Sequence, residues 1–398
     1  MGNKLRELVQ ILWFLSLCSV SNFGLCSEVE SPRNKRLFSL FQIITFPNDP
    51  CVGNAGKNGT CYTNEECNSR RGSSGGTCAQ GYGVCCTFTI NCGATSNENC
   101  TYFESAGSEI GGCRATICPC GDNICQLRLD FDMFVISGPS TSADVIGMAT
   151  SGQISGAGQP VSSQTRCLTD IFSVGDPNGC APPTICGTNS GEHMYVDAAD
   201  ACNDLTFELG QQGQGTGIAD RQWSIKVTQY SCDSKNLAPE GCTQYFFGND
   251  EGAIQTYNYV NGIHLANQDQ NICIRRERGN CQICYTTEED EDFSVSGMAV
   301  TVKTAGDMCC GYGTDGMGTT GYDCIQIPGA QVKTGAMTRI QDVICGSGKG
   351  IGINGDTKTI CSNIHPFNLR FTSDQFDFMT ETGIKGFRLL YSQNSMDC

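Results

Sequence analysis

The chain has few basic residues and very few histidines. It carries 25 Lys and Arg against 41 Asp and Glu, a formal net charge of −16, and three histidines in 398 residues. Recognition of phosphates needs clustered Lys and Arg, so this balance argues against nucleic acid as a partner. His193, His264 and His365 form no H-E-x-x-H pair, and no "GDSGG"-like nucleophile segment occurs. We therefore expect no enzyme activity.

Long apolar runs are also scarce. The run "ILWFLSLCSV" (Ile11 to Val20) follows two basic residues and is shorter than the about 20 residues that cross a bilayer. Small residues between Ser21 and Ser27 suit signal-peptidase cleavage, so residues 1–26 are predicted to be a signal peptide. No later segment is apolar for long enough to span a membrane, and the ending "SQNSMDC" resembles no lipid-anchor tail. We expect a soluble, secreted, extracellular protein.

Cysteine, by contrast, is abundant. Twenty-nine Cys in a chain of this length predict disulfides formed in an oxidising compartment. The short gaps of "ICPC" and "CQIC" also occur in zinc sites, but disulfides explain them better in a secreted chain. We expect these cysteines to bond with one another rather than to bind metal.

Residues 27–50 are interpreted as a linker or propeptide. Within them, "RNKR" (Arg33 to Arg36) fits either furin-type processing after Arg36 or an ordinary basic linker. Cleavage there would remove Cys18 and Cys26 and leave 27 of the 29 cysteines, an odd number. At least one cysteine would then be free or bonded to another chain, which makes a covalent homodimer possible.

A compact group of six cysteines follows, over residues 51–86. This segment is rich in Gly, Ser and Asn and contains too little apolar material to fold without covalent cross-links. Three internal bridges are the simplest arrangement, and the spacing alone leaves all 15 connectivities open. The six are Cys51, Cys61, Cys67, Cys78, Cys85 and Cys86.

The remaining chain has the pattern of short strands. "CQLRLDFDMFVI" (Cys125 to Ile136) alternates apolar and polar residues with one interruption, as a half-buried strand does. "RQWSIKVTQY" and "GFRLLYSQ" show the same alternation, and 49 glycines with few heptad-like stretches argue against a helical protein. The predicted class is all-β, as a sandwich or barrel.

Two halves of this region, residues 92–232 and 242–398, are diverged copies of one domain. "ICGTNSGEHMYVD" at 185–197 returns as "ICGSGKGIGINGD" at 344–356, and the polar "DSKNLAPEG" at 233–241 is the linker. Glu192 and His193, which look like a catalytic or metal site, are replaced in the second copy by Ile351 and Gly352, so the shared part is scaffold. The cysteines that correspond or that close a copy are Cys186 with Cys345, Cys202 with Cys361, and Cys232 with Cys398.

These features resemble a known arrangement. The order of an early cysteine, an "ICG" element, an "LxF" strand and a closing strand such as "GFRLLYSQNSMDC" is similar to the CUB domain, and the six-cysteine module resembles arthropod clip-type modules. The resemblance to arthropod secreted proteins with tandem CUB-like domains implies two disulfide-tied jelly-roll β-sandwiches. It also implies the pairs Cys51–Cys85, Cys61–Cys78 and Cys67–Cys86.

Many CUB domains bind calcium through acidic loop residues, which suits a hard cation that needs several oxygen ligands. By position, the second copy offers Asp323 and Asp374, without a clear counterpart for the expected Glu. In the first copy, Asp170 corresponds to Asp323 but Gly210 stands where Asp374 would be. The alternative is that these aspartates only cap turns. The resemblance implies a calcium site at Asp323 and Asp374 and no other cofactor.

Two smaller features complete the pattern. "NGT" at Asn58 and "NCT" at Asn99 are N-glycosylation sequons in loop-like polar stretches, so both are predicted glycosylation sites. The acidic run "EEDED" (Glu288 to Asp292) is interpreted as a solvated loop.

The sequence thus predicts a non-catalytic extracellular protein that binds proteins or glycans through its CUB-like domains. Two alternatives remain open: a non-catalytic regulator of an extracellular protease cascade, suggested by the clip-like module, and a disulfide-linked structural or matrix protein.

Overall fold

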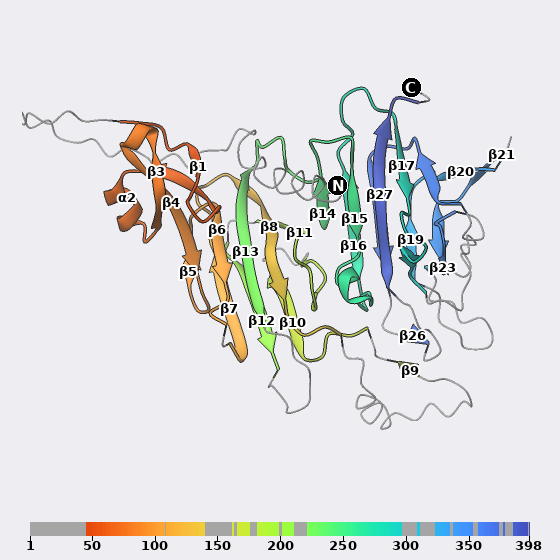
Figure 1. Cartoon of the computed structure of the whole chain (residues 1–398), viewed down its shortest axis with the longest axis horizontal. Coiled ribbons are helices and arrows are strands. Elements are labelled where there is room, and N and C mark those ends of the chain that lie inside the picture. Colours follow the sequence, from red (N-terminus) through yellow and green to blue (C-terminus); the bar gives the residue numbers. More distant parts are fainter. Residues whose placement is uncertain are drawn as a thin grey trace, which may run out of the picture.

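The computed structural model describes residues 45–107, 109–139, 161–162, 165–175, 181–198, 201–210, 221–296, 309–310, 323–334, 337–352, 357–373, 377–378, 385–396 and 398. The predicted signal peptide, the site after Arg36 and Asp374 lie outside these residues. The described part contains no helix long and apolar enough to cross a membrane. It is almost entirely β-structure, arranged as a small module and two sandwiches in a row (Figure 1).

The small module consists of antiparallel strands and one short helix, held together by three disulfides. Its helix begins after Thr63, whose side chain accepts the Glu66 backbone N–H while the Glu66 side chain accepts that of Thr63, a reciprocal capping box. The disulfides are Cys51–Cys85, Cys61–Cys78 and Cys67–Cys86, the same pairs that the clip-type resemblance implies. The elements are β1 (Pro50–Val52), β2 (Asn58–Tyr62), α2 (Asn64–Ser69), β3 (Ser73–Cys78), the 3-10 turn η1 (Ala79–Gly81) and β4 (Gly83–Ile90).

The first sandwich shares a sheet with this module. β4 continues beyond Cys86 and pairs in parallel with β6, with Phe88 opposite Thr101. The shared sheet has the order β1-β2-β4-β6-β13-β8-β11, and the facing sheet has the order β10-β12-β7-β5. The strands are β5 (Thr95–Ser96), β6 (Thr101–Glu104), β7 (Gly111–Ile117), β8 (Ile124–Val135), β10 (Asp170–Gly175), β11 (His193–Asp197), β12 (Asn203–Leu209) and β13 (Gln222–Ser231).

The predicted strand at 125–136 is β8, but its alternation changes phase. Asp132 has no register partner on β13, where Phe131 pairs with Ile225 and Met133 with Ser224. Such a bulge moves the following side chains to the opposite face. Phe134 is therefore fully buried, whereas Met133 is 42% exposed, the reverse of the strict alternation.

The second sandwich has the same plan. One sheet has the order β14-β16-β25-β19-β22, and the other runs β21-β20-β24-β17-β27-β18-β23 with β15 also on β27. The elements are β14 (Gln244–Phe246), β15 (Glu251–Gln255), the 3-10 turn η4 (Tyr259–Asn261), β16 (Asp269–Ile274), β17 (Gln282–Thr286), β18 (Phe293–Ser294), β19 (Cys324–Gln326), β20 (Gln331–Thr334), β21 (Met337–Ile340), β22 (Val343–Cys345), β23 (Ser347–Gly348), β24 (Thr359–Ser362), β25 (Phe367–Thr372) and β27 (Gly386–Asn394). A two-stranded pair joins β9 (Val161–Ser162) to β26 (Asp377–Phe378). The all-β prediction of two tandem sandwiches behind a disulfide-rich module is confirmed.

The disulfides of the two copies correspond in part. Cys92–Cys113, Cys125–Cys232 and Cys167–Cys186 occupy the places of Cys242–Cys273, Cys281–Cys398 and Cys309–Cys345. A further bond, Cys310–Cys324, lies in the second sandwich.

The predicted match of Cys202 with Cys361 is wrong in the structure. Cys202 bonds Cys118, whereas Cys361 lies within β24 and bonds Cys284 on the neighbouring strand. The fixed offset that aligns Cys186 with Cys345 therefore no longer holds at Cys361. By register, Cys284 opposite Cys361 takes the place of Arg128 opposite Tyr195. The counterparts of Glu192 and His193 are therefore Lys358 and Thr359, and the predicted match with Ile351 and Gly352 is wrong.

Candidate functional site

The pair Glu192 and His193 lies where the two sandwiches meet. Gly191 has a φ of 88° and ends a tight turn, and its N–H donates to the Phe131 carbonyl at 2.7 Å. Left-handed backbone of this kind favours glycine. The turn delivers the two residues to the start of β11, an edge strand in contact with β14 of the second half.

The Glu192 carboxylate is held from two strands of the second half. Gln244 donates to Oε2 at 2.9 Å and Gln255 donates to Oε1 at 2.7 Å. Desolvation raises the pKa of Glu192 to about 7, against the lowering effect of the two amides. This carboxylate bridges the two sandwiches, and its donors are glutamine amides.

His193 is engaged in the same junction. His193 Nε2 lies 3.1 Å from both the N–H and the carbonyl of Tyr245, and the residue is 5% exposed. Desolvation, helped by the nearby Arg128 guanidinium, lowers the pKa of His193 to about 3. The imidazole is therefore neutral at physiological pH, and its Nε2 bonds the Tyr245 backbone across the junction.

A segment of the second half enters the core of the first. Tyr257 and Leu265 are packed among the buried side chains of the first sandwich, and the Tyr257 hydroxyl donates to the His193 carbonyl at 2.9 Å. The Asn258 N–H donates to Asn189 Oδ1 at 2.8 Å. The two sandwiches thus share buried side chains as well as surface contacts.

Aromatic rings continue the junction. The Tyr195 N–H donates to the Thr243 carbonyl at 2.8 Å, and the Tyr195 ring stacks on Tyr230 at a centroid distance of 6.2 Å. Tyr195 also packs with Tyr245 in a small cluster that includes Ala238 from the predicted linker. The linker is therefore part of the packed junction.

Asp170 of the first copy has a cationic side chain as its partner. Arg221 donates from Nε and Nη2 to the Asp170 carboxylate at 2.8 and 2.7 Å, and also to the Gly210 carbonyl at 2.6 Å. The Asp170 side chain is 0% exposed and the Arg221 side chain is 4% exposed. An arginine guanidinium therefore bonds both Asp170 and Gly210, the positions that correspond to Asp323 and Asp374 of the second copy.

Of the predicted calcium ligands, only Asp323 is described. Its Oδ2 lies 3.5 Å from Nε2 of His264, which is fully buried. Within the described ranges, no three His, Cys, Asp or Glu side chains gather in a way that would hold a metal ion. Because Asp374 lies outside those ranges, calcium at Asp323 and Asp374 stays a prediction.

The predicted zinc-like cysteine gaps carry disulfides. In "ICPC", Cys118 bonds Cys202, and in "CQIC", Cys281 bonds Cys398 and Cys284 bonds Cys361.

The acidic run is only partly a solvated loop. Glu288 to Glu291 are exposed, and Asp290 pairs with Lys349 at 3.2 Å. Asp292, however, is 2% exposed and accepts the Tyr259 hydroxyl at 2.7 Å and the backbone N–H of Glu289 at 2.7 Å. It folds the run into a turn, so the prediction is wrong for this residue.

The sequons differ in their surroundings. Asn58 lies in β2 and is 8% exposed, so the expectation of a loop is wrong there, because the small module pairs this segment on both sides. Asn99 lies in a turn, where its Nδ2 donates to the Gln229 carbonyl at 3.1 Å. Glycosylation at both stays a prediction.

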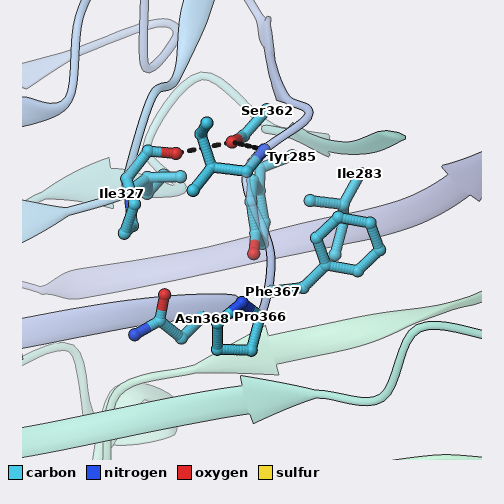
Figure 2. A pocket seen from close by; sticks show the side chains of 9 residues that line it. Ile283, Tyr285, Ile327, Ser362, Pro366, Phe367 and Asn368 are labelled. Carbon is cyan, nitrogen blue, oxygen red and sulfur yellow. Dashed lines mark hydrogen bonds between the residues drawn. The ribbon is translucent and has the colours of Figure 1, made fainter. Parts of the chain in front are cut away.

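A shallow pocket lies on the second sandwich. It covers about 140 Å³, open solvent included, beside the exposed Ile364, and the buried Tyr285 hydroxyl has no hydrogen-bond partner among the described residues (Figure 2). The lining residues are Ile283, Tyr285, Ile327, Pro328, Ser362, Ile364, Pro366, Phe367 and Asn368.

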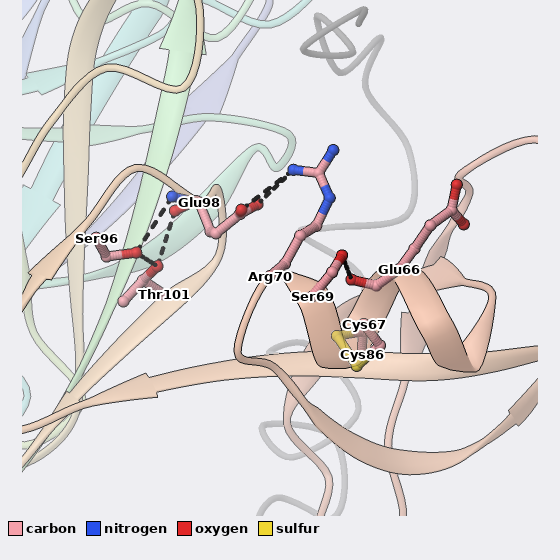
Figure 3. Close-up of polar contacts among 8 residues, drawn as sticks. All are labelled: Glu66, Cys67, Ser69, Arg70, Cys86, Ser96, Glu98 and Thr101. Atoms are coloured by element: carbon pink, nitrogen blue, oxygen red, sulfur yellow. Dashed lines mark hydrogen bonds and ion pairs between the residues drawn. A yellow bond between two sulfur atoms is a disulfide. The ribbon is translucent and has the colours of Figure 1, made fainter.

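Ion pairs also join the small module to the first sandwich. Arg70, at the end of α2, donates to Glu98 at 3.1 Å, and Glu98 is held in turn by Ser96, whose hydroxyl accepts its N–H (Figure 3). Lys57, just before β2, pairs at 2.8 Å with Glu104 at the end of β6. The module is thereby fixed by side chains in addition to the shared sheet.

The sequence alone did not reveal the partners at the junction. Gln244, Gln255 and Tyr257 belong to no motif, and they meet Glu192 only through folding. The available signal was negative: Glu192 and His193 differ from the second copy, which marks them as specific to the first.

Comparison with known proteins places one part of the chain in a family. Residues 239–394 match the model of the animal CUB domain. The second half therefore contains a CUB domain, a kind of module typical of extracellular proteins and used in protein interactions. No curated protein matches the chain.

Several solved structures are similar to the chain, among them the following three. The CUB1-EGF-CUB2 domains of rat MASP-1 share 15% identity over 76% of this chain and 99% of that one, with a TM-score of 0.22. The same domains of human MASP-1/3 share 13% over 74% and 98%, with a TM-score of 0.21. The extracellular region of zebrafish Gpr126/Adgrg6 shares 9% over 78% of this chain and 34% of that one, with a TM-score of 0.22. At these TM-scores, the overall likeness supports no argument about arrangement.

Proposed function

We propose that the protein is a secreted, non-catalytic extracellular binding protein, in which the CUB domain at 239–394 and the CUB-like first sandwich recognise proteins or glycans. The observation that carries the proposal is the animal CUB match over a disulfide-tied β-sandwich. The positions of two histidines support it: His193 is neutral and bonded to the Tyr245 backbone in the junction, and His264 is fully buried beside Asp323.

Two alternatives rest on separate features. The three-disulfide module resembles clip-type modules and favours a non-catalytic regulator of a protease cascade. The odd cysteine count expected after cleavage at Arg36 favours a structural protein whose chains are joined by disulfides.

The experiment uses the full secreted chain, immobilised and exposed to native extracellular fluid and, separately, to a glycan array. We expect specific protein or glycan partners that are lost when the chain is reduced and alkylated, because the sandwiches depend on their disulfides. Recovery of proteases above all other partners would favour the regulator, and multimers that disappear on reduction would favour the matrix protein. Catalytic conversion of any recovered partner by the purified chain would overturn the proposal that the protein is non-catalytic.

A further inference from the structure

Glu192 and His193 are adjacent in sequence and together contact two strands of the second half, β14 and β15. The Glu192 carboxylate takes one amide hydrogen bond from β14 and one from β15, through Gln244 and Gln255. His193 Nε2 lies 3.1 Å from both the backbone N–H and the carbonyl of Tyr245 on β14, and its tautomer decides whether it accepts from the first or donates to the second. Two neighbouring residues of one edge strand thus bind the second sandwich at three points.

We propose that Glu192 and His193 form a latch that locks the two sandwiches at one fixed angle, so that a partner meets both as a single rigid surface. Only the reference to a partner rests on the proposed function. The latch closes over a shared core, because Tyr257 of the second half is 1% exposed among side chains of the first. Opening the junction would therefore expose apolar surface and two groups that can take up protons.

The groups that face Glu192 carry no formal positive charge. From β14 and β15 it faces the two glutamine amides, and after β15 it faces Tyr257, whose pKa is raised by burial and which therefore stays neutral. A closed latch thus holds the carboxylate without a cation, which favours its protonated form.

The groups that face His193 are charged. From β8 it faces Arg128 and Asp130, which form an ion pair at 2.7 Å, and Lys226 on β13 lies 3.9 Å from the same aspartate. Its neighbours on β11 and β14 are the rings of Tyr195 and Phe246. This surrounding keeps the closed-state imidazole neutral.

The pKa values of the two latch residues shift in opposite directions when the junction is closed. Closure raises the pKa of Glu192 from 4.5 to about 7, so closure is favoured as pH falls through that range. Burial in the closed junction, with Arg128 nearby, lowers the pKa of His193 from its ordinary 6.5 to about 3, so closure is disfavoured as pH falls from 6.5 towards 3. Between about pH 6.5 and 4.5 the two effects oppose each other, so the pH dependence of closure is small in that range.

Hydrogen exchange of junction amides tests the latch in the full chain. The readouts are the amides of Tyr195 and Asn258, which donate across the junction to Thr243 and Asn189. After correction for intrinsic exchange rates, we expect the wild-type protection factors to change little between about pH 6.5 and 5. E192Q removes the glutamate titration, so protection should fall on acidification, by up to about tenfold per pH unit.

The histidine variant should show the opposite slope. H193Q removes the histidine titration, and protection should rise on acidification by up to about tenfold per pH unit. The controls are E208Q and H365Q, which alter exposed residues of the first and second halves and should keep the wild-type profile.

Slopes of E192Q and H193Q that match the controls, with melting temperatures unchanged, would overturn the latch. If a variant fails to fold, the pH profile of the wild type decides, because a steep change between about pH 6.5 and 5 contradicts balanced titrations. The result is independent of any ligand. Opposite slopes in a chain that binds no partner would retain the latch and refute the proposed function.

Discussion

Replacement of Arg221 by methionine should destabilise the first sandwich strongly. The side chain of Asp170 is fully buried and receives two hydrogen bonds from the Arg221 guanidinium, together with the backbone N–H groups of Ser137 and Gly210 at 2.9 and 3.1 Å. Removing the arginine leaves a buried carboxylate without a cation. Such a change costs about 3–5 kcal/mol.

The magnitude can be measured through one fluorophore. Trp223 is 2% exposed, stacks on Phe207 at a centroid distance of 4.0 Å, and is the only tryptophan outside the predicted signal peptide. Its emission should therefore report unfolding of the first sandwich, whose core it shares with Tyr257 and Leu265. With disulfides intact, a loss of about 3–5 kcal/mol should lower the melting temperature by roughly 6–20 °C, at about 2–4 °C per kcal/mol.

Two further variants test whether the loss of stability comes from the buried ion pair or from the removal of any arginine. R114M removes an exposed ion pair between Arg114 and Asp204 on neighbouring strands, and such pairs contribute about 0–1 kcal/mol. D170N combined with R221M leaves no buried charge and should be more stable than R221M alone. The reasoning is refuted if R221M costs no more than R114M, or if the double variant is the less stable one.

Three other changes test separate features. G187A should weaken the junction more than G191A, because both glycines have positive φ but only a Cβ at 187 would overlap a side chain of the second half; equal loss of amide protection would contradict this. Y285F should leave stability unchanged or raise it by up to about 1–3 kcal/mol, since the buried hydroxyl lacks a partner; a clear drop in melting temperature would show that it has one. The proposed calcium site predicts heat on calorimetric titration that D323N and D374N abolish, and no heat at millimolar calcium would remove the site.

Much of the architecture could be predicted from the sequence because it depends on local patterns. Period-two alternation and turn residues mark the strands, and the repeated "ICG" element shows the duplication. The alternation failed at Asp132, because a bulge depends on the partner strand and not on the residues of β8 alone. The match of Cys202 with Cys361 failed for a related reason, since spacing does not say which strand faces a cysteine.

The junction could not be predicted in the same way. The contacts of Glu192 with Gln244 and Gln255 join residues 52 and 63 positions apart, and glutamine amides leave no recognisable pattern. Arg221 is an isolated arginine before a strand, and only the fold brings it to Asp170. The sequence contained a hint of specificity in Glu192 and His193, but their role depends on tertiary structure.

The parallel pairing of β4 with β6 has a mechanical consequence. Tension that enters the chain before Cys51 would pass through the Cys51–Cys85 disulfide directly into β4 and bypass the intervening 33 residues, since the bond spans a sequence separation of 34. From β4 it would reach the first sandwich through the ladder that pairs Phe88 with Thr101 and Ile90 with Phe103. A force along these strands would load all the hydrogen bonds between β4 and β6 in shear at the same time. The small module would then transmit force to the first sandwich while its own loops carry none.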